Sequence, residues 1–135
     1  MESRQGIVDS SVLVAFFRGD DSNHQRAVEF MEKIDSFAIS DYILLEVTTV
    51  LQQKVGLELT RKAVEFLVNN RDVELLSINN QELGDTLALF FEQKFKLSFV
   101  DCSILVLAKN RGLIVSTLDD GMIKAGKWLN ESSHN

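Results

Sequence analysis

Four short runs of apolar and β-branched residues, separated by longer stretches with helical spacing, constrain the fold of this chain most strongly. The strand-like runs are Gly6–Asp9, Phe37–Ile39, Val73–Ile78 and Leu113–Ser116. Where short strands alternate with helices, the strands usually lie parallel in one sheet, with the helices on its faces. The sequence therefore predicts an α/β fold of three layers (α/β/α) around a short-stranded central parallel sheet.

The stretches between these runs carry helix signals. Ser, Asp and Asn residues precede several of them as candidate N-caps, and glycines follow the last apolar position as candidate stops. The chain contains no proline, so these residues are the main markers of its breaks. The predicted helices are Val12–Phe17, a segment from Asp21 or Ser22 to about Lys33, Tyr42–Val55, Thr60–Asn69, Gln81–Phe95, Phe99–Asn110 and Asp119–Trp128.

Length and composition indicate one domain. A chain of 135 residues has the usual size of a single domain, so we expect residues 1–135 to fold as one unit, with a frayed tail over about 130–135. A single cysteine, Cys102, excludes an intramolecular disulfide. The N-terminal segment lacks the apolar run of a signal peptide, and no stretch is apolar enough to span a membrane, so a cytoplasmic location is expected.

The charge of the chain is uneven. The net charge is −6, which argues mildly against binding of nucleic acid through bulk electrostatics. The window from Lys94 to Lys127, however, holds six basic and three acidic residues. Its basic residues could guide RNA phosphates, or they could form an ordinary solvated surface.

Three carboxylates interrupt apolar segments. Asp9 follows Ile7 and Val8, Glu46 is the only charge between Asp41 and Lys54, and Asp101 is the only charge between Lys96 and Lys109. A fourth acid, Asp119, comes just after the last predicted strand. Burial of an ionised carboxylate is costly unless it is paired or bound to a metal.

Each acid also has a simpler interpretation. Asp9 could cap the helix that follows it, and Glu46 could pair with a lysine. Asp101 has the strongest alternative, because Ser98-x-x-Asp101 fits a capping box. The four acids all lie beside apolar faces or at predicted strand ends. We therefore expect their side chains to lie close together, since sites in parallel sheets form at the carboxyl ends of the strands.

A cluster of four carboxylates would need compensation. At an effective dielectric constant near 20, each close like-charge pair costs on the order of 3 kcal/mol. The cluster would then be partly protonated or would bind a divalent cation, and ligands that are all oxygen favour Mg²⁺ or Mn²⁺. A bound cation would also create a local positive site on an acidic protein.

Four segments resemble the motifs of the PIN-domain family, in the same order and at similar spacing over nearly the whole chain. These segments are IVDSSVLVAFF, YILLEVTTVL, LSFVDCSILVLAK and LIVSTLDDGMIKAG. The length resembles that of the stand-alone VapC-like toxins of type II toxin–antitoxin pairs. The resemblance implies an endoribonuclease that cuts RNA with bound Mg²⁺ or Mn²⁺, a small antitoxin protein that blocks the site, and a homodimer.

The resemblance assigns roles to individual residues. The catalytic, metal-binding positions are Asp9, Glu46, Asp101 and Asp119. Ser11 and Thr117 occupy the positions of accompanying polar residues that orient a carboxylate or a metal-bound water. Asp120 either substitutes for Asp119 or adds a further acid. No choice between one and two metal ions follows from the sequence.

Other functions remain as alternatives. A phosphatase that forms an aspartyl-phosphate would carry a second Asp at the position of Ser11, and no G-x-G-x-x-G motif for a dinucleotide follows the first strand. A PIN-like RNA-binding or scaffold module without nuclease activity is the main alternative. The four retained acids argue against it, because a scaffold has no use for carboxylates that repel one another.

Overall fold

The four strands form one parallel sheet. The structure is a computed structural model that describes residues 5–132. Its strands are β1 (Gly6–Val8), β2 (Phe37–Ser40), β3 (Val73–Leu76) and β4 (Ile114–Ser116), in the spatial order β3-β2-β1-β4. Ile7 lies at the centre of the sheet, opposite Ala38 on one side and Val115 on the other. The sheet therefore places the first strand of the sequence between the second and the last.

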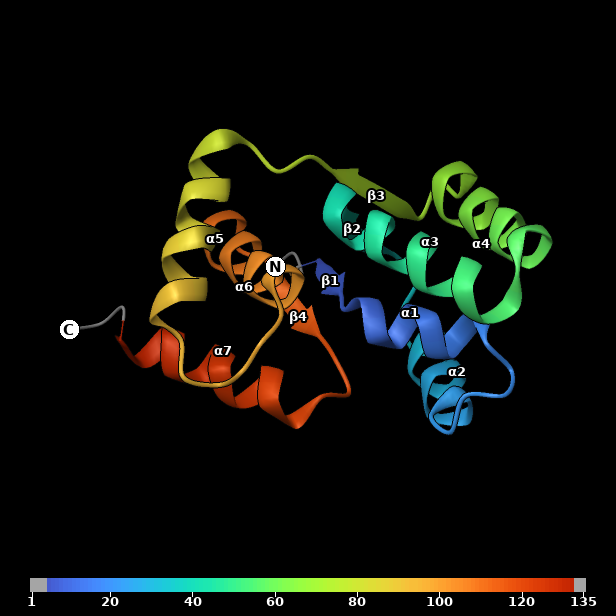
Figure 1. Cartoon of the computed structure of the whole chain (residues 1–135), viewed down its shortest axis with the longest axis horizontal. Coiled ribbons are helices and arrows are strands. Elements are labelled where there is room, and N and C mark those ends of the chain that lie inside the picture. Colours follow the sequence, from blue (N-terminus) through green and yellow to red (C-terminus); the bar gives the residue numbers. More distant parts are fainter. Residues whose placement is uncertain (1–4, 133–135) are drawn as a thin grey trace.

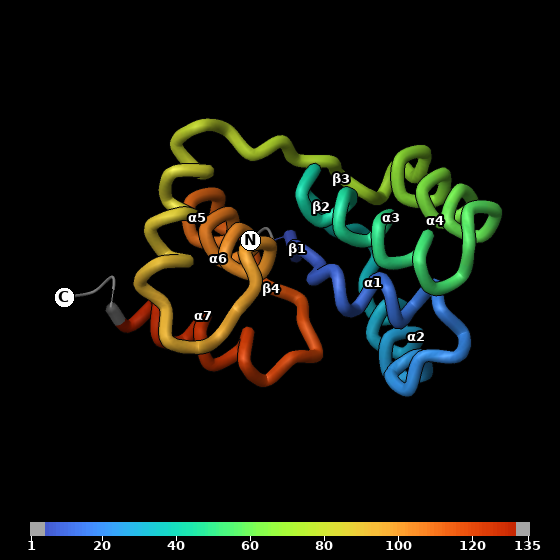
Figure 2. Tube along the Cα trace, in the orientation of Figure 1, coloured from blue at the N-terminus to red at the C-terminus, as the bar shows by residue number. Residues whose placement is uncertain are grey.

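Helices cover the sheet in two groups. Figure 1 shows α1 to α4 on one side of the strands and α5 to α7 on the other. The helices are α1 (Ser10–Phe17), α2 (His24–Glu32), α3 (Asp41–Val55), α4 (Leu57–Asn69), α5 (Asn80–Glu92), α6 (Phe99–Arg111) and α7 (Asp120–Ser132). The predicted three-layer α/β/α class is confirmed. The chain passes between the two groups along the extended segment that joins β3 to α5 (Figure 2).

The core lies between the sheet and the two helical layers. All four residues of β2 are buried, as are Ile7 and Val8 of β1. Helix α3 contributes Ile43, Val47 and Leu51, which recur every four residues along one face and are fully buried. Such a stripe is the ordinary way in which a helix packs onto a sheet. Helix α6 instead buries six consecutive residues, Cys102 to Leu107, so it is surrounded by the fold on several sides.

Two predicted elements end two or three residues earlier than the sequence indicated. The strand expected to reach Ile78 ends at Leu76, because the Ile78 N–H donates to the carboxylate of Asp41 at 3.3 and 3.4 Å and so leaves the sheet. The helix expected to reach Phe95 ends at Glu92. The side-chain oxygen of Gln93 there accepts hydrogen bonds from the backbone N–H groups of Phe95 and Leu97, which turns the chain away from helical geometry.

The end of the chain is helical further than expected. Helix α7 continues through Ser132, and the remainder of the expected frayed tail, residues 133–135, lies outside the described residues. Within residues 5–132, no helix combines the length and apolar character needed to cross a membrane.

Candidate functional site

The four predicted acids lie around the carboxyl edge of the sheet, and each comes from a different segment. Asp9 directly follows β1, and Asp119 follows β4 by three residues. Glu46 lies on the second turn of α3, which begins where β2 ends, and Asp101 lies in the first turn of α6. Asp9 and Asp101 both interact electrostatically with Glu46, and Asp9 and Asp119 both interact with Asp101. The structure therefore gathers the four carboxylates into one electrostatic cluster, which we call the acidic site.

Asp9 is the buried centre of the acidic site. The residue is only 2% exposed, and its carboxylate accepts hydrogen bonds from three hydroxyl groups and one backbone N–H. The Ser11 hydroxyl donates to Oδ2 at 3.0 Å, and the Thr117 hydroxyl donates to the same oxygen at 2.8 Å. The Ser11 N–H, 3.4 Å from Oδ1, makes Asp9 the N-cap of α1. The two polar residues expected to orient a carboxylate thus contact the same acid.

Ser10 is a residue of this site that the sequence interpretation did not include. It is 2% exposed, and its hydroxyl lies 3.0 Å from Oε1 of Glu46 and 3.4 Å from Oδ1 of Asp9. A hydroxyl carries one proton, so it donates to one of these carboxylates at a time. Its position next to Asp9 was visible in the sequence, but its contact with Glu46 spans 36 residues and depends on how α3 packs against α1.

Thr117 links the first acid to the fourth. Its hydroxyl donates to Asp9 and accepts a hydrogen bond from the Asp119 N–H at 3.0 Å. The Asp119 carboxylate in turn accepts from the Gly121 N–H at 2.7 Å, where α7 begins. Asp120 is the exposed first residue of α7, and no hydrogen bond or ion pair described within residues 5–132 connects it to the other acids. The geometry favours Asp119 over Asp120 as the fourth acid.

The alternative interpretation of Asp101 as a cap describes a real contact. Its Oδ2 accepts from the Ser98 N–H at 3.2 Å, while the Ser98 hydroxyl accepts from the Asp101 N–H at 3.1 Å, which completes a capping box. Asp101 is also close enough to Asp9 and Asp119 for their charges to raise its pKa. Capping and membership of the acidic site therefore occur together in one residue.

The described part of the chain supplies no counter-charge to the acidic site. Burial raises the pKa of Glu46, as do the charges of Asp101 and Asp9, while the hydrogen bond from Ser10 lowers it. Burial likewise raises the pKa of Asp101, together with the charges of Asp9 and Asp119. Across the described range 5–132, no Lys, Arg or His side chain forms an ion pair with any of these four acids. The cluster thus carries negative charge that no basic side chain of residues 5–132 pairs.

The donor set fits a hard divalent cation, but the side chains do not already form its coordination shell. All four donors are carboxylates, which suit Mg²⁺ or Mn²⁺ better than zinc. As arranged, no three His, Cys, Asp or Glu side chains of residues 5–132 are grouped closely enough to hold a metal ion. Asp101 and Asp119 each use one oxygen in a local capping contact. A shared ion would require the carboxylates to move closer together, and the second oxygen of Asp101 and of Asp119 could bind it.

Two other residues, one beside the acidic site and one away from it, have structural roles. Cys102 is fully buried, and desolvation, assisted by the charge of Asp101, raises the pKa of its thiol to about 11, so it is a poor nucleophile. Arg111, one of the basic residues that could guide RNA, forms an ion pair with Glu82 at 2.7 Å. It is therefore engaged away from the acidic site.

The fold and the acidic site define a class of protein: a parallel α/β domain with clustered carboxylates at the carboxyl edge of its sheet. The sequence model of the PIN domain matches residues 6–127, which is most of the chain. The chain therefore belongs to the PIN-domain family. No curated protein sequence matches it.

Solved structures share this fold. VapC20 from Mycobacterium tuberculosis, described as a sarcin-ricin loop cleaving toxin, has a TM-score of 0.83 at 18% identity over 90% of this chain and 95% of that chain. FitAcB from Neisseria gonorrhoeae has a TM-score of 0.68 at 16% identity, covering 91% of this chain and 94% of that one. A toxin–antitoxin complex from Klebsiella pneumoniae has a TM-score of 0.59 at 22% identity, covering 85% and 87%. The expected likeness to VapC-type toxins is thus confirmed at the level of the fold.

Proposed function

We propose that this chain is a metal-dependent endoribonuclease that hydrolyses RNA phosphodiester bonds. The observation that carries the proposal is the convergence of Asp9, Glu46, Asp101 and Asp119 from four segments without a counter-charge among the described residues. Repelling carboxylates lower stability, so their convergence is most easily explained by a function that needs a cation there.

In this proposal the four acids hold one or two Mg²⁺ or Mn²⁺ ions. The bound metal would supply Lewis-acid stabilisation of the phosphoryl oxygens and would lower the pKa of an attacking water. Ser11 and Thr117 fix the orientation of the Asp9 carboxylate from both sides. The Ser10 hydroxyl holds Glu46 beside Asp9. Because the Thr117 hydroxyl also accepts from the Asp119 N–H, it sets the backbone position of the fourth acid.

The biological setting that we propose is a toxin–antitoxin pair in the cytoplasm. Support comes from the structural neighbours, which include a sarcin-ricin loop cleaving toxin and a toxin–antitoxin complex. On this proposal the chain is the toxin, its substrate is RNA, and a cognate small antitoxin protein blocks the acidic site.

We also propose a homodimer formed next to the acidic site. A hollow of about 560 Å³ lies between α3 and α6 and is lined by Tyr42, Leu45, Glu46 and Phe99, among others. Leu45 is 68% exposed, and Phe91 on α5 is 81% exposed. Exposed apolar surface of this kind is typical of protein–protein contacts. A second copy that covered it would place two acidic sites near one another.

The alternative is a PIN-like RNA-binding or scaffold module without nuclease activity. One observation favours it: Asp101 and Asp119 are engaged in capping contacts, and the described residues contain no ready three-ligand group. A protein that had lost catalysis could keep these acids as helix caps alone.

A cleavage assay with Asp101→Asn separates the two functions. Asparagine keeps the shape of the side chain and can still accept the capping hydrogen bond, but it lacks the charge. Wild type should cut structured RNAs with Mg²⁺ or Mn²⁺ and not with a chelator, and the variant should lose at least about a hundredfold in rate. Asp41→Asn is the matched control, because Asp41 is an exposed acid in the first turn of α3 that lies outside the acidic site.

Circular dichroism would first confirm that all three proteins are folded. Equal cleavage by wild type and Asp101→Asn would contradict the proposed site. Absence of cleavage by wild type, with Mn²⁺ binding that is the same in both proteins, would support the scaffold alternative.

A further inference from the structure

A second surface feature lies beside β4, on a different part of the molecule from the apolar hollow near Glu46. A groove of about 580 Å³ runs between the C-terminal half of α6, strand β4 and helix α7. Its walls are polar and apolar in about equal measure, and Leu105, Ile114 and Met122 are among the apolar lining residues. The charged residues in its lining are Lys109 and Lys127, and no acid lines it.

The groove exposes the edge of the sheet. Strand β4 is the last strand in the order β3-β2-β1-β4, so it pairs only on its β1 side within the described sheet. The Ile114 N–H donates to the Gln5 carbonyl, and the Ser116 carbonyl accepts from the Asp9 N–H. Residues 114 and 116 thus direct their backbone groups toward β1. Because these directions alternate along a strand, the N–H and C=O of Val115 point away from β1, on the side of the groove.

The two edges of the sheet differ in how they are protected. Natural edge strands commonly carry charged side chains that discourage further pairing. Strand β3 follows this rule, because Glu74 in its middle is exposed. Strand β4 has the sequence Ile-Val-Ser, with no charge, and its Ile114 is 51% exposed. The β4 edge is the one that remains open to another strand.

We propose that an acidic, extended segment of a partner protein binds in this groove and adds a strand to the edge of β4. Its backbone would pair with the N–H and C=O of Val115, apolar side chains would lie on the groove wall, and acidic side chains would meet Lys109 and Lys127. Addition of a strand to an open edge is a common way of binding a peptide. The positive lining complements an acidic segment, although the chain as a whole has a net charge of −6.

The chemistry of the groove favours a peptide over the other occupants. An RNA strand would depend on a row of cations, whereas this lining offers two lysines among otherwise uncharged residues. A second copy of this acidic chain would bring no acidic residue of its own β4 to the lysines, since that strand is uncharged. The inference does not rest on nuclease activity. Thr117 belongs to both the groove lining and the acidic site, so an occupant would end beside the acids.

The test uses isotope-labelled full-length protein and a short peptide of alternating valine and glutamate. Nuclear magnetic resonance would follow the amide of Val115 and its rate of hydrogen exchange during titration. The peptide should shift the Val115 signal and slow its exchange several-fold. A peptide of the same sequence in which every amide is N-methylated, so that neither edge can donate a hydrogen bond, should have no such effect.

Charge reversal provides the second test. The double variant Lys109→Glu/Lys127→Glu should weaken peptide binding by about tenfold at low salt. The matched control is Lys62→Glu, which reverses an exposed lysine on α4 outside the groove and should leave binding unchanged. Thermal unfolding would show that each variant is folded.

Three results would overturn the proposal. One is a Val115 signal that does not discriminate between the two peptides, either because neither peptide shifts it at millimolar concentration or because both shift it equally. Another is a stronger shift of Val115 with single-stranded RNA than with the peptide, which would make the groove a nucleic-acid surface. The third is a change of the Val115 signal with protein concentration alone, which would show that a second copy occupies the edge.

Discussion

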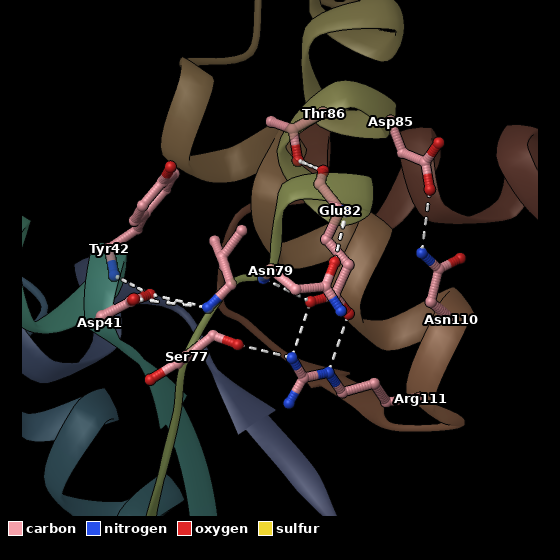
Figure 3. A network of polar contacts seen from close by, with 10 residues as sticks. Asp41, Tyr42, Ser77, Asn79, Glu82, Asp85, Thr86, Asn110 and Arg111 are labelled. Carbon is pink, nitrogen blue, oxygen red and sulfur yellow. Dashed lines mark hydrogen bonds and ion pairs between the residues drawn. The ribbon is translucent and has the colours of Figure 1, made fainter.

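Glu46 and Glu82 are both removed from bulk solvent to some degree, but the protein surrounds them in opposite ways. Glu82 is 4% exposed, and the guanidinium of Arg111 donates to its two carboxylate oxygens at 2.8 and 2.7 Å (Figure 3). These hydrogen bonds hold the pKa of Glu82 below its ordinary value. Glu46 receives one hydrogen bond from Ser10 and faces other acids, and its pKa is raised.

The arrangement around Glu82 is a structural link. Arg111 also donates to the carbonyl of Ser77 in the segment that joins β3 to α5, and Asn79 completes a capping box with Glu82 (Figure 3). The network therefore fixes the C-terminal end of α6 to the start of α5. The chain thus supplies a cation for Glu82, whereas no Lys, Arg or His of residues 5–132 forms an ion pair with Glu46, which is the position where we propose that a metal ion binds.

Metal binding should distinguish the acidic site from the network around Glu82 and Arg111 most clearly. Addition of Mn²⁺ at about 100 times its dissociation constant should stabilise wild type by about 2.7 kcal/mol, because the ion binds only the folded site. Asp101→Asn should lose most of this gain. Arg111→Met should keep it, because Arg111 is not part of the acidic site. Differential scanning calorimetry with and without Mn²⁺ provides the measurement, and an equal gain in Asp101→Asn would contradict the site.

Removal of Arg111, the counter-charge of Glu82, should destabilise the protein. Arg111→Met leaves the buried Glu82 carboxylate without its partner, so the free energy of unfolding should fall by about 2 kcal/mol. This loss is smaller than for a fully buried pair, because the Arg111 side chain is 30% exposed. Urea unfolding measures it. The double variant Glu82→Gln/Arg111→Met should recover part of the loss, and additive losses would show that the pair is not coupled.

Neutralisation of Glu46 should change the free energy of unfolding in the opposite direction. In the presence of a chelator, Glu46→Gln removes repulsion within the acidic site while an amide still accepts from Ser10. The free energy of unfolding should rise by about 1 kcal/mol, as is common when a strained functional site is relaxed. Glu82→Gln is the matched control and should lower stability. A loss of stability in Glu46→Gln would mean that its charge is compensated within the protein.

The smallest expected effect is the pH dependence of the free energy of unfolding. The pKa of Glu46 is raised in the folded state, so protonation favours folding, and the deficit of wild type relative to Glu46→Gln should shrink as pH falls from 7 toward 4.5. The pKa of Glu82 is lowered, so its contribution is full above 4.5 and is lost only as pH falls further. Urea unfolding of wild type, Glu46→Gln and Glu82→Gln at several pH values should show these two pH ranges. In each range the free energy of unfolding should change by less than about 1 kcal/mol. Identical pH profiles for the three proteins would contradict the opposite pKa shifts of Glu46 and Glu82.

Several features of the fold follow from local sequence and were predicted from it. Ser40 and Ser98 are the N-caps of α3 and α6, and their side chains accept from the backbone of the first turn. The same two helices end immediately before Gly56 and Gly112, both of which have positive φ. The order of short strands and helices predicted the parallel sheet. Asp9, Glu46 and Asp101 stand out in the sequence because each is a charge inside an apolar segment, where burial of a charge is costly.

The sequence alone determined the local elements and supplied the candidate acids, because caps, turns and apolar periodicity act over a few residues. The tertiary structure decided which charges meet. The Ser10–Glu46 contact and the Arg111–Glu82 pair join residues separated by 36 and 29 positions, and the open edge of β4 depends on the spatial order of the strands. Hydrogen bonds and close electrostatic contacts require short distances, and distances between remote segments are set only when the sheet and its helices pack together.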